Sequence, residues 1–200
     1  AYLDKARALS GENKISILAS LTRLRQLCVD PGSFLEDFPT STKLEYTVDL
    51  VRENIENGHK AIIFSSFNST LLDLKSLLDE ESIQSGVITG DTSAKDRLSL
   101  CEDFNTKDDI KVMLVSLKAG GVGLNLIGAD TVIHLDPWWN PQAENQATDR
   151  AHRIGQTRPV TVLRLIMRDT VEEKVLSLQK QKKDLYDEIV EGNGGVSSLS

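Results

Sequence analysis

Two amides and two guanidinium groups recur at helical spacing within residues 140–156, NPQAENQATDRAHRIGQ. Asn140 is a favoured N-cap residue, Pro141 suits the first helical position, and Gly155 suits the cap that ends a helix. At about 100° per residue, the four side chains fall within an arc of roughly 80°. They are Gln142, Gln146, Arg150 and Arg153. A helix face with paired arginines suits bidentate contacts to phosphate.

The charge of the whole chain contrasts with this arginine-rich face. Its 200 residues hold 23 Lys and Arg against 30 Asp and Glu, for a formal net charge of −7. This acidity argues against a protein that coats nucleic acid through bulk charge, but it allows a local basic strip. Residues 73–109 are rich in acids, whereas arginines gather further along the chain, so the charge indicates one anion-facing surface. The gathered arginines are Arg150, Arg153, Arg158, Arg164 and Arg168.

A glycine-rich loop, KAGGVGLNL, follows a strongly apolar run. Gly120, Gly121 and Gly123 allow a close backbone approach and can present amide donors to a phosphate. A dinucleotide fingerprint would need a further glycine where Leu126 stands, which disfavours a self-contained Rossmann-like enzyme. The chain also has no Walker A pattern of glycines followed by Gly-Lys-Ser/Thr. The chain therefore has arginines that could contact a triphosphate but no phosphate-binding loop of the Walker A type. We expect that loop on another domain.

Short apolar runs alternate with amphipathic segments in the centre of the chain, which predicts βαβ units and an α/β fold. We expect five or six parallel strands within residues 60–166, with helices on both faces of the sheet. Strands are predicted at 61–66, 86–89, 110–117, 131–135 and 159–166. Helices are predicted at 14–28, 43–57, 69–80, 93–104, 140–156 and 170–190, and residues 191–200 as a flexible tail.

In such sheets, function lies in the loops at the carboxyl ends of the strands. Four loops of unusual composition are predicted there, namely FNST (67–70), TGDTS (89–93), SLKAGGVGLNL (116–126) and DPWWNP (136–141). The last of these leads directly into the arginine-bearing helix. The predicted anion site therefore lies at this edge of the sheet.

Other function classes find little support. No run of about 18 apolar residues exists, so no membrane span is expected, and the N-terminus lacks a signal pattern. Cys28 and Cys101 belong to no metal-spacing motif and are expected to be reduced thiols. We expect a cytoplasmic protein, associated with the nucleoid if it is bacterial, that has no metal site of its own.

Together these motifs resemble the C-terminal RecA-like lobe of the Swi/Snf-type DNA-dependent ATPases, in helicase superfamily two. The resemblance covers nearly the whole chain: LRQLCVDP (24–31), KAIIFSSF (60–67), VITGDTSAKDRLSLCEDF (87–104) and the unbroken stretch 112–166. The run DRAHRIGQ within that stretch is highly specific. Val29-Asp30, Gly90-Asp91 and Pro137-Trp138 depart from the usual pattern, which suggests a divergent, bacterial branch.

The resemblance implies a three-layer α/β/α lobe with a mostly parallel sheet at residues 43–168. A helical extension at 1–42 would precede it, and a brace helix at 169–190 and a tail at 191–200 would follow. ATP and Mg would be held mainly by an N-terminal RecA-like lobe of the same polypeptide, with no cofactor in this chain alone. The motor would move along double-stranded DNA, which it would contact through the backbone.

The same resemblance implies a role for individual side chains. Arg150 and Arg153 would be arginine fingers, and Gln146, Gly121 and Gly123 would contact or shape the ATP site. Contacts to DNA phosphates are implied for Ser66, Thr92, Ser116 and Lys118, with Trp139 against the groove or backbone.

Plainer interpretations stand beside these roles. Ser66, Thr92 and Ser116 could simply cap helices or end strands, and one of Trp138 and Trp139 is expected to be a packing residue. His134 and His152 fit structural roles better than catalytic ones, and Asp136 is expected to orient the loop after it. An alternative function is a non-catalytic α/β lobe that binds DNA or a protein partner.

Overall fold

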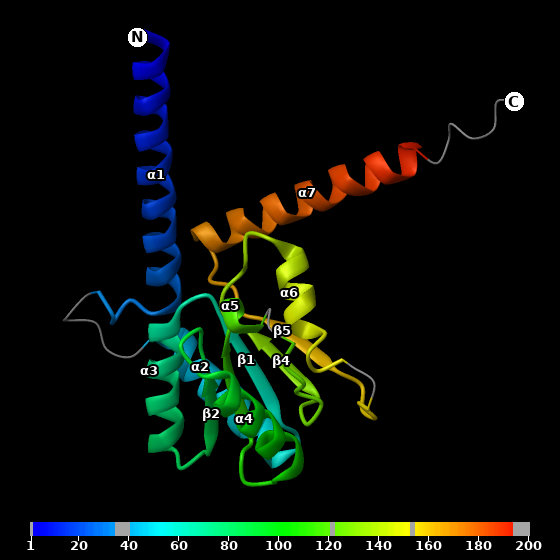
Figure 1. Ribbon diagram of the computed structural model, residues 1–200. Coiled ribbons are helices and arrows are strands. Elements are labelled where there is room, and N and C mark those ends of the chain that lie inside the picture. The colour runs from blue at the N-terminus through cyan, green and yellow to red at the C-terminus, as the bar shows by residue number, and fades with distance from the viewer. Residues whose placement is uncertain (1, 35–40, 121–122, 153–154, 194–200) are drawn as a thin grey trace, which may run out of the picture.

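The computed structural model describes residues 2–34, 41–120, 123–152 and 155–193 (Figure 1). Helices and strands alternate along these residues. Their order is α1 (Tyr2–Val29), α2 (Thr42–Glu56), β1 (Ala61–Ser65), α3 (Asn68–Glu80), β2 (Ser85–Ile88), α4 (Ala94–Thr106), β3 (Val112–Ser116), α5 (Leu117–Gly120), β4 (Thr131–His134), α6 (Pro141–Thr148), β5 (Thr161–Arg164) and α7 (Val171–Asn193).

The five strands form one sheet in the order β2-β3-β1-β4-β5, and every neighbouring pair is parallel. The prediction of an α/β fold with five or six parallel strands is therefore confirmed. The register places Ser65 beside Ser116 and His134 beside Arg164. Because these residues end their strands, the loops that follow them leave from one edge of the sheet.

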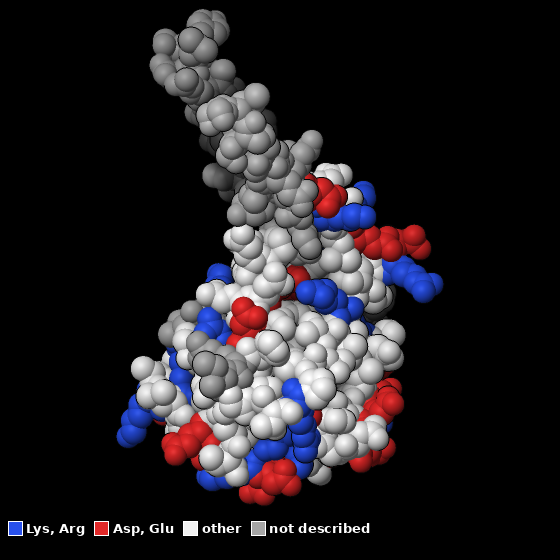
Figure 2. All heavy atoms as spheres, turned by 90° about the vertical axis from the view of Figure 1, so that its right-hand side faces the viewer, with Lys and Arg blue, Asp and Glu red and all other residues white. Residues whose placement is uncertain are grey.

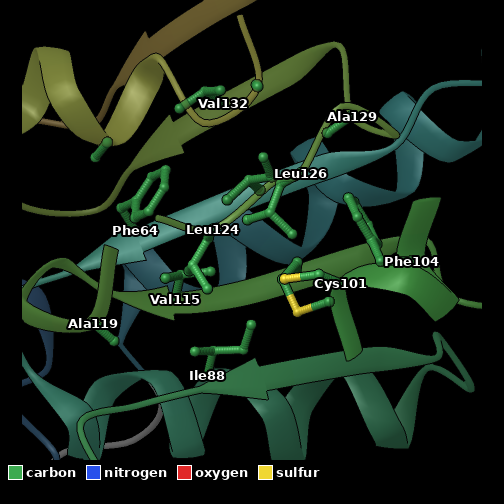
Figure 3. Close-up of a cluster of buried hydrophobic side chains, with 14 of the residues drawn as sticks. Phe64, Ile88, Cys101, Phe104, Val115, Ala119, Leu124, Leu126, Ala129 and Val132 are labelled. Carbon is green, nitrogen blue, oxygen red and sulfur yellow. The ribbon is translucent and has the colours of Figure 1, made fainter. Parts of the chain in front are cut away.

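Both faces of the sheet are buried, as the apolar character of the strands predicts. Alternate residues of a strand point to opposite faces. Ile62 and Phe64 of β1 lie in a cluster with residues of α4 and of the stretch 124–129, part of which Figure 3 shows. Ile63 of the same strand lies in the other cluster, with side chains of α2 and α3. The fold thus has three layers, with the sheet between two layers of helices.

Local signals account for several boundaries. The Ser93 side chain accepts a hydrogen bond from the Asp96 backbone N–H at 3.1 Å, as expected of the N-cap of α4. Gly58 follows α2 with φ of +77°, a conformation that favours glycine. Asn140 accepts from the Gln142 N–H at 3.1 Å and Pro141 opens α6, which confirms the predicted start of that helix.

The predicted end of α6 is wrong. The sequence predicts a helix to the end of 140–156, but α6 ends at Thr148 and tight turns follow. The Arg150 N–H bonds to the Ala147 carbonyl at 3.1 Å, three residues back, and the Arg150 carbonyl accepts the Leu126 N–H at 3.1 Å. The hydrogen bond from Leu126 thus occupies the Arg150 carbonyl, which would accept an intrahelical bond if α6 continued. Gln146 and Arg150 do not share one helix face.

Two flanking helices are longer than predicted. Helix α1 begins at Tyr2, and α7 continues to Asn193, three residues into the predicted tail. Both helices extend away from the sheet (Figure 1). Along the part of α1 whose side chains are described, Ile17 and Leu18 are exposed. None of the described helices has the length and hydropathy needed to cross a bilayer.

A buried ion pair fastens the start of α7 to the lobe. The Lys43 ammonium lies 2.7 Å from a Glu172 carboxylate oxygen and donates to the carbonyls of Leu135 and Leu165 at 2.9 and 3.2 Å. Glu172 also accepts the Met167 N–H at 2.8 Å. Burial raises the pKa of Glu172 above its ordinary value, although Lys43 opposes the shift. The pair therefore joins α2, the ends of β4 and β5, and α7.

Substituting Lys43→Met should lower the free energy of unfolding by about 3–5 kcal/mol, because it leaves the Glu172 carboxylate buried without a cation. Denaturant titration followed by circular dichroism measures this loss. Replacing both partners, Lys43→Met with Glu172→Leu, should recover most of it. The loss in the single variant should also shrink as the pH falls, because a carboxyl with a raised pKa takes up a proton in the folded state. A double variant as unstable as the single one would contradict this assignment.

Candidate functional site

The carboxyl edge of the sheet is organised around one carboxylate. Asp136 follows β4 and is fully buried. Its Oδ1 accepts hydrogen bonds from the Ser65 hydroxyl at 2.8 Å and the Ser66 N–H at 2.9 Å, and its Oδ2 accepts from the Ser66 hydroxyl. Asp136 therefore ties the loop after β1 to the loop after β4, in agreement with the expectation that it orients the following loop.

Arg25 of α1 neutralises this carboxylate. Its Nη2 lies 2.8 Å from Asp136 Oδ2 and donates to the Pro137 carbonyl at 2.7 Å, and the Arg25 side chain is only 4% exposed. The guanidinium also lies over two aromatic rings, 5.3 Å from the centroid of Phe67 and 5.5 Å from that of Trp139. Helix α1 is thus part of the site and sets the position of the tryptophan loop.

The five side chains predicted to contact DNA lie in different environments along this edge. Ser66 is bonded to Asp136 and receives a hydrogen bond from Arg25 at 3.2 Å. Ser116 is only 2% exposed, and its hydroxyl accepts the Ala119 N–H at 3.3 Å. Lys118, two residues further on, is exposed. The structure therefore leaves Lys118 accessible and holds both serines in local hydrogen bonds.

The loop after β2 is closed on itself. Thr92 is partly buried, and its hydroxyl accepts the Thr89 N–H at 2.9 Å. Arg97 of α4 donates to the carbonyls of Thr89 and Gly90 at 3.2 and 2.9 Å. These bonds give the predicted DNA-contact loop a fixed shape.

The two tryptophans divide as expected. Trp138 is partly buried and packs against the cluster that contains Phe64. Trp139 is also partly buried, with its ring against the Arg25 guanidinium. Trp138 is therefore the packing residue expected of the pair.

Three of the predicted nucleotide-binding residues are described: Gly123 follows β3, Gln146 lies in α6 and Arg150 follows α6. Gly123 has φ of +38°, which favours glycine, and nothing crowds the position of an added Cβ. Gln146 is exposed on α6. Arg150 is only 7% exposed, and its Nε has no hydrogen-bond partner. No ion pair joins Arg150 to an acid in the part of the chain that the structure describes. Gly121 and Arg153 lie outside the described residues.

A second buried carboxylate, which the sequence did not single out as a site, lies in the first turn of α6. Glu144 is 1% exposed and accepts the Trp138 N–H at 2.6 Å, the Arg164 Nε–H at 3.1 Å and the Gln179 amide at 3.2 Å. These partners come from three separate segments of the chain. No local sequence signal could have revealed such a meeting point.

His134 lies beside this carboxylate as a neutral ring. Burial lowers its pKa to about 4, and the nearby Glu144 only partly offsets this shift, to which Arg164 adds. The ring stacks on Phe64 with centroids 5.5 Å apart, and its Nε2 lies 3.2 Å from the Thr148 hydroxyl. These contacts fit the structural role expected of His134.

Two of the gathered arginines pair with buried acids instead of facing an anion. Arg158 pairs with Asp130 at 3.1 Å near the opposite edge of the sheet, and Arg164 pairs with Glu144 at 3.1 Å. Burial disfavours the Asp130 carboxylate, yet hydrogen bonds from His59 and Arg158 outweigh it and hold the pKa of Asp130 below its ordinary value.

The face of the molecule in Figure 2 shows charged side chains of both signs, mostly towards its rim. The described part of that face carries no broad patch of a single sign. Lys118 lies in α5, directly after β3, and is exposed, and Arg150 follows α6.

Comparisons with known proteins agree with these features. The model of the helicase conserved C-terminal domain matches residues 42–155. A protein of Schizosaccharomyces pombe named an uncharacterized ATP-dependent helicase is 44% identical over 204 residues, which covers 99% of this chain and 20% of that protein. The putative ATP-dependent helicase/translocase YwqA of Bacillus subtilis is 38% identical over 207 residues, with 98% and 22% covered.

A solved structure, the C-terminal part of the Fun30 ATPase domain, superposes with a TM-score of 0.66 at 32% identity. The match covers 79% of this chain and 54% of that one. The chain spans about a fifth of the length of the two sequence relatives. Because these relatives come from a fungus and a bacterium, the bacterial branch stays a prediction.

Removing the Arg25 cation should free Trp139. In a Trp138→Phe background, where Trp139 is the last tryptophan, Arg25→Met should increase the quenching of fluorescence by acrylamide, because the guanidinium no longer covers the ring. The matched control is Arg23→Met, an exposed arginine of the same helix that lies over Phe34. Equal quenching in the two variants would show that Arg25 does not hold the tryptophan loop.

Proposed function

Because the chain belongs to the helicase conserved C-terminal domain family, as the C-terminal RecA-like lobe of a Snf2-type ATP-dependent helicase, we propose that it completes the ATP site of a DNA translocase. In this proposal an N-terminal lobe of the same polypeptide holds ATP and Mg. The present lobe supplies arginine fingers and contacts to the backbone of double-stranded DNA. Closing and opening of the two lobes would then move the DNA.

The state of Arg150 is the observation that carries the proposal. A buried cation is expensive unless an anion neutralises it. Arg150 is 7% exposed, has an unpaired Nε, and is joined to no acid among the described residues. It lies directly after the helix that leaves the carboxyl edge, where α/β proteins bind ligands. The phosphate chain of ATP has the charge and the geometry that this guanidinium would pair with.

Arg153 is proposed as the second finger on the same phosphates. Gln146, which is exposed on α6, would contact the nucleotide, and Gly121 and Gly123 would shape the loop beside it. Without a Walker A pattern the chain cannot hold ATP and Mg by itself, so we expect it to be inactive when isolated. The described residues contain no cluster of three His, Cys, Asp or Glu side chains that could hold a metal ion.

Contacts to DNA are proposed for Lys118 and Trp139 from the accessible end of the site, and for Ser66, Thr92 and Ser116 from the loops behind them. The hydrogen bonds of the three hydroxyl groups fix the loop backbones, so their direct contribution to phosphate binding should be smaller than that of Lys118. No base-reading element is visible in the sequence, and therefore no sequence preference is expected.

Substituting Arg150→Ala in the complete polypeptide should lower the kcat of DNA-stimulated ATP hydrolysis by roughly 10³-fold or more, because a finger stabilises charge in the transition state. Steady-state kinetics at saturating DNA measure the effect, and Arg150→Lys should not restore it. Arg158→Ala, which removes an arginine from the opposite edge, is the matched control. Full activity in Arg150→Ala would favour the alternative, a lobe that only binds DNA or a protein partner.

The isolated chain should bind duplex DNA weakly and with a strong dependence on salt. If it contacts two or three phosphates, affinity should fall about 10- to 40-fold between 50 and 200 mM salt. Lys118→Ala should lower the salt slope by about one unit, because one phosphate contact is lost. Lys111, at the other end of β3 and paired with Asp108, provides the control variant Lys111→Ala. Fluorescence anisotropy with labelled duplexes measures both slopes, and a flat salt curve would contradict phosphate contacts.

A further inference from the structure

The buried carboxylate of Glu144 is bound by three parts of the chain that are distant in sequence. The Trp138 N–H belongs to the loop after β4, the Arg164 guanidinium to β5, and the Gln179 amide to α7. Because Glu144 itself lies in the first turn of α6, these bonds fix the position of that helix. Displacing any of them leaves part of a buried charge uncompensated, which is costly.

Helix α7 reaches Glu144 from a fixed starting point. Its first turn is held by the Lys43–Glu172 pair at the ends of β4 and β5. Gln179 lies seven residues after Glu172, which is about two helical turns, and so projects from the same face. Gln179 is 9% exposed and donates both to Glu144 and to the Trp138 carbonyl. The helix is therefore joined to the site at two points.

The bonds that hold α6 in place also limit the position of Arg150, which follows the end of that helix. The helix has only eight residues, and Arg150 follows its last residue, Thr148, by two positions. Ala147 and Ala151, on either side of Arg150, are buried in the core cluster. A shift or rotation of so short a helix therefore moves Arg150 with it.

We infer that Glu144 is a positioning residue that couples helix α7 to the placement of Arg150. This inference rests on the proposed function, in which Arg150 meets the ATP phosphates. Beyond Gln179, α7 continues away from the sheet (Figure 1). A displacement of this outer part of α7 therefore also shifts Gln179. The position of α7 then controls the rate of hydrolysis, whereas ATP binding depends mainly on the other lobe.

Substituting Gln179→Leu in the complete polypeptide tests the coupling. The kcat of DNA-stimulated ATP hydrolysis should fall about tenfold or more, because small misplacements of a catalytic group have large effects. The KM for ATP should stay within about twofold, since the finger acts mainly in the transition state. Gln181→Leu makes the same change at an exposed position of the same helix and should leave both constants unchanged. An unchanged kcat in Gln179→Leu would overturn the inference.

A second variant adds a pH readout. Gln179→Glu places two carboxyl groups against each other, and two close carboxylates do not both ionise readily. As the pH falls, one proton shared between the two carboxyl groups should restore a hydrogen bond between α7 and residue 144, so the kcat relative to that of the unsubstituted enzyme should rise severalfold. Arg164 also bonds to Glu144, and the nearby His134 has a pKa lowered by burial to about 4.

The outcomes separate this inference from the proposal beneath it. Full activity of Arg150→Ala would remove the proposed function, whatever Gln179→Leu does. An inactive Arg150→Ala variant with a normal Gln179→Leu variant would remove only the coupling. A pH-independent activity ratio in Gln179→Glu would also overturn the coupling. Thermal unfolding of each variant, followed by circular dichroism, confirms that the kinetics are measured on folded protein.

Discussion

The charge buried at the end of β4 is the constraint on which the candidate site depends. Taking a carboxylate out of water costs several kcal/mol, even after the protein relaxes. Among the described residues, the Arg25 guanidinium and the donors of Ser65 and Ser66 compensate Asp136. The loop after β1, the loop after β4 and helix α1 must therefore all be in place together. Trp139 takes its position from the same arginine.

Much of the fold could be predicted because its signals are local. Apolar, β-branched runs predict the five strands, and the alternation of strands with helices predicts a parallel sheet. Parallel connection then requires the unusual loops to leave from one edge. The cap at Asn140 was likewise visible in the sequence, because a capping side chain bonds to its immediate neighbours.

The polar connections of the site could not be predicted, because their partners are far apart in the chain. Arg25 and Asp136 are 111 residues apart, and Gln179 and Glu144 are 35 apart. The predicted end of α6 was wrong for a related reason. Local preference favours a helix up to Gly155, but a hydrogen bond from Leu126 takes the Arg150 carbonyl, and tertiary contacts override propensity. Arg150 is therefore buried after the end of α6, whereas the sequence predicted it on one helix face with Gln146.

The Lys43–Glu172 pair bears on where the independently folding unit begins and ends. The family model covers residues 42–155, and the sequence places the lobe at 43–168. A fragment that ended at residue 155 or 168 would keep Lys43 and the Leu135 carbonyl but lose the Glu172 carboxylate that balances the ammonium. A fragment that began at Lys43 would also lose Arg25 and leave Asp136 without its cation. We therefore expect the cooperative unit to extend at least from Arg25 to Gln179, which includes the end of α1 and the first turns of α7.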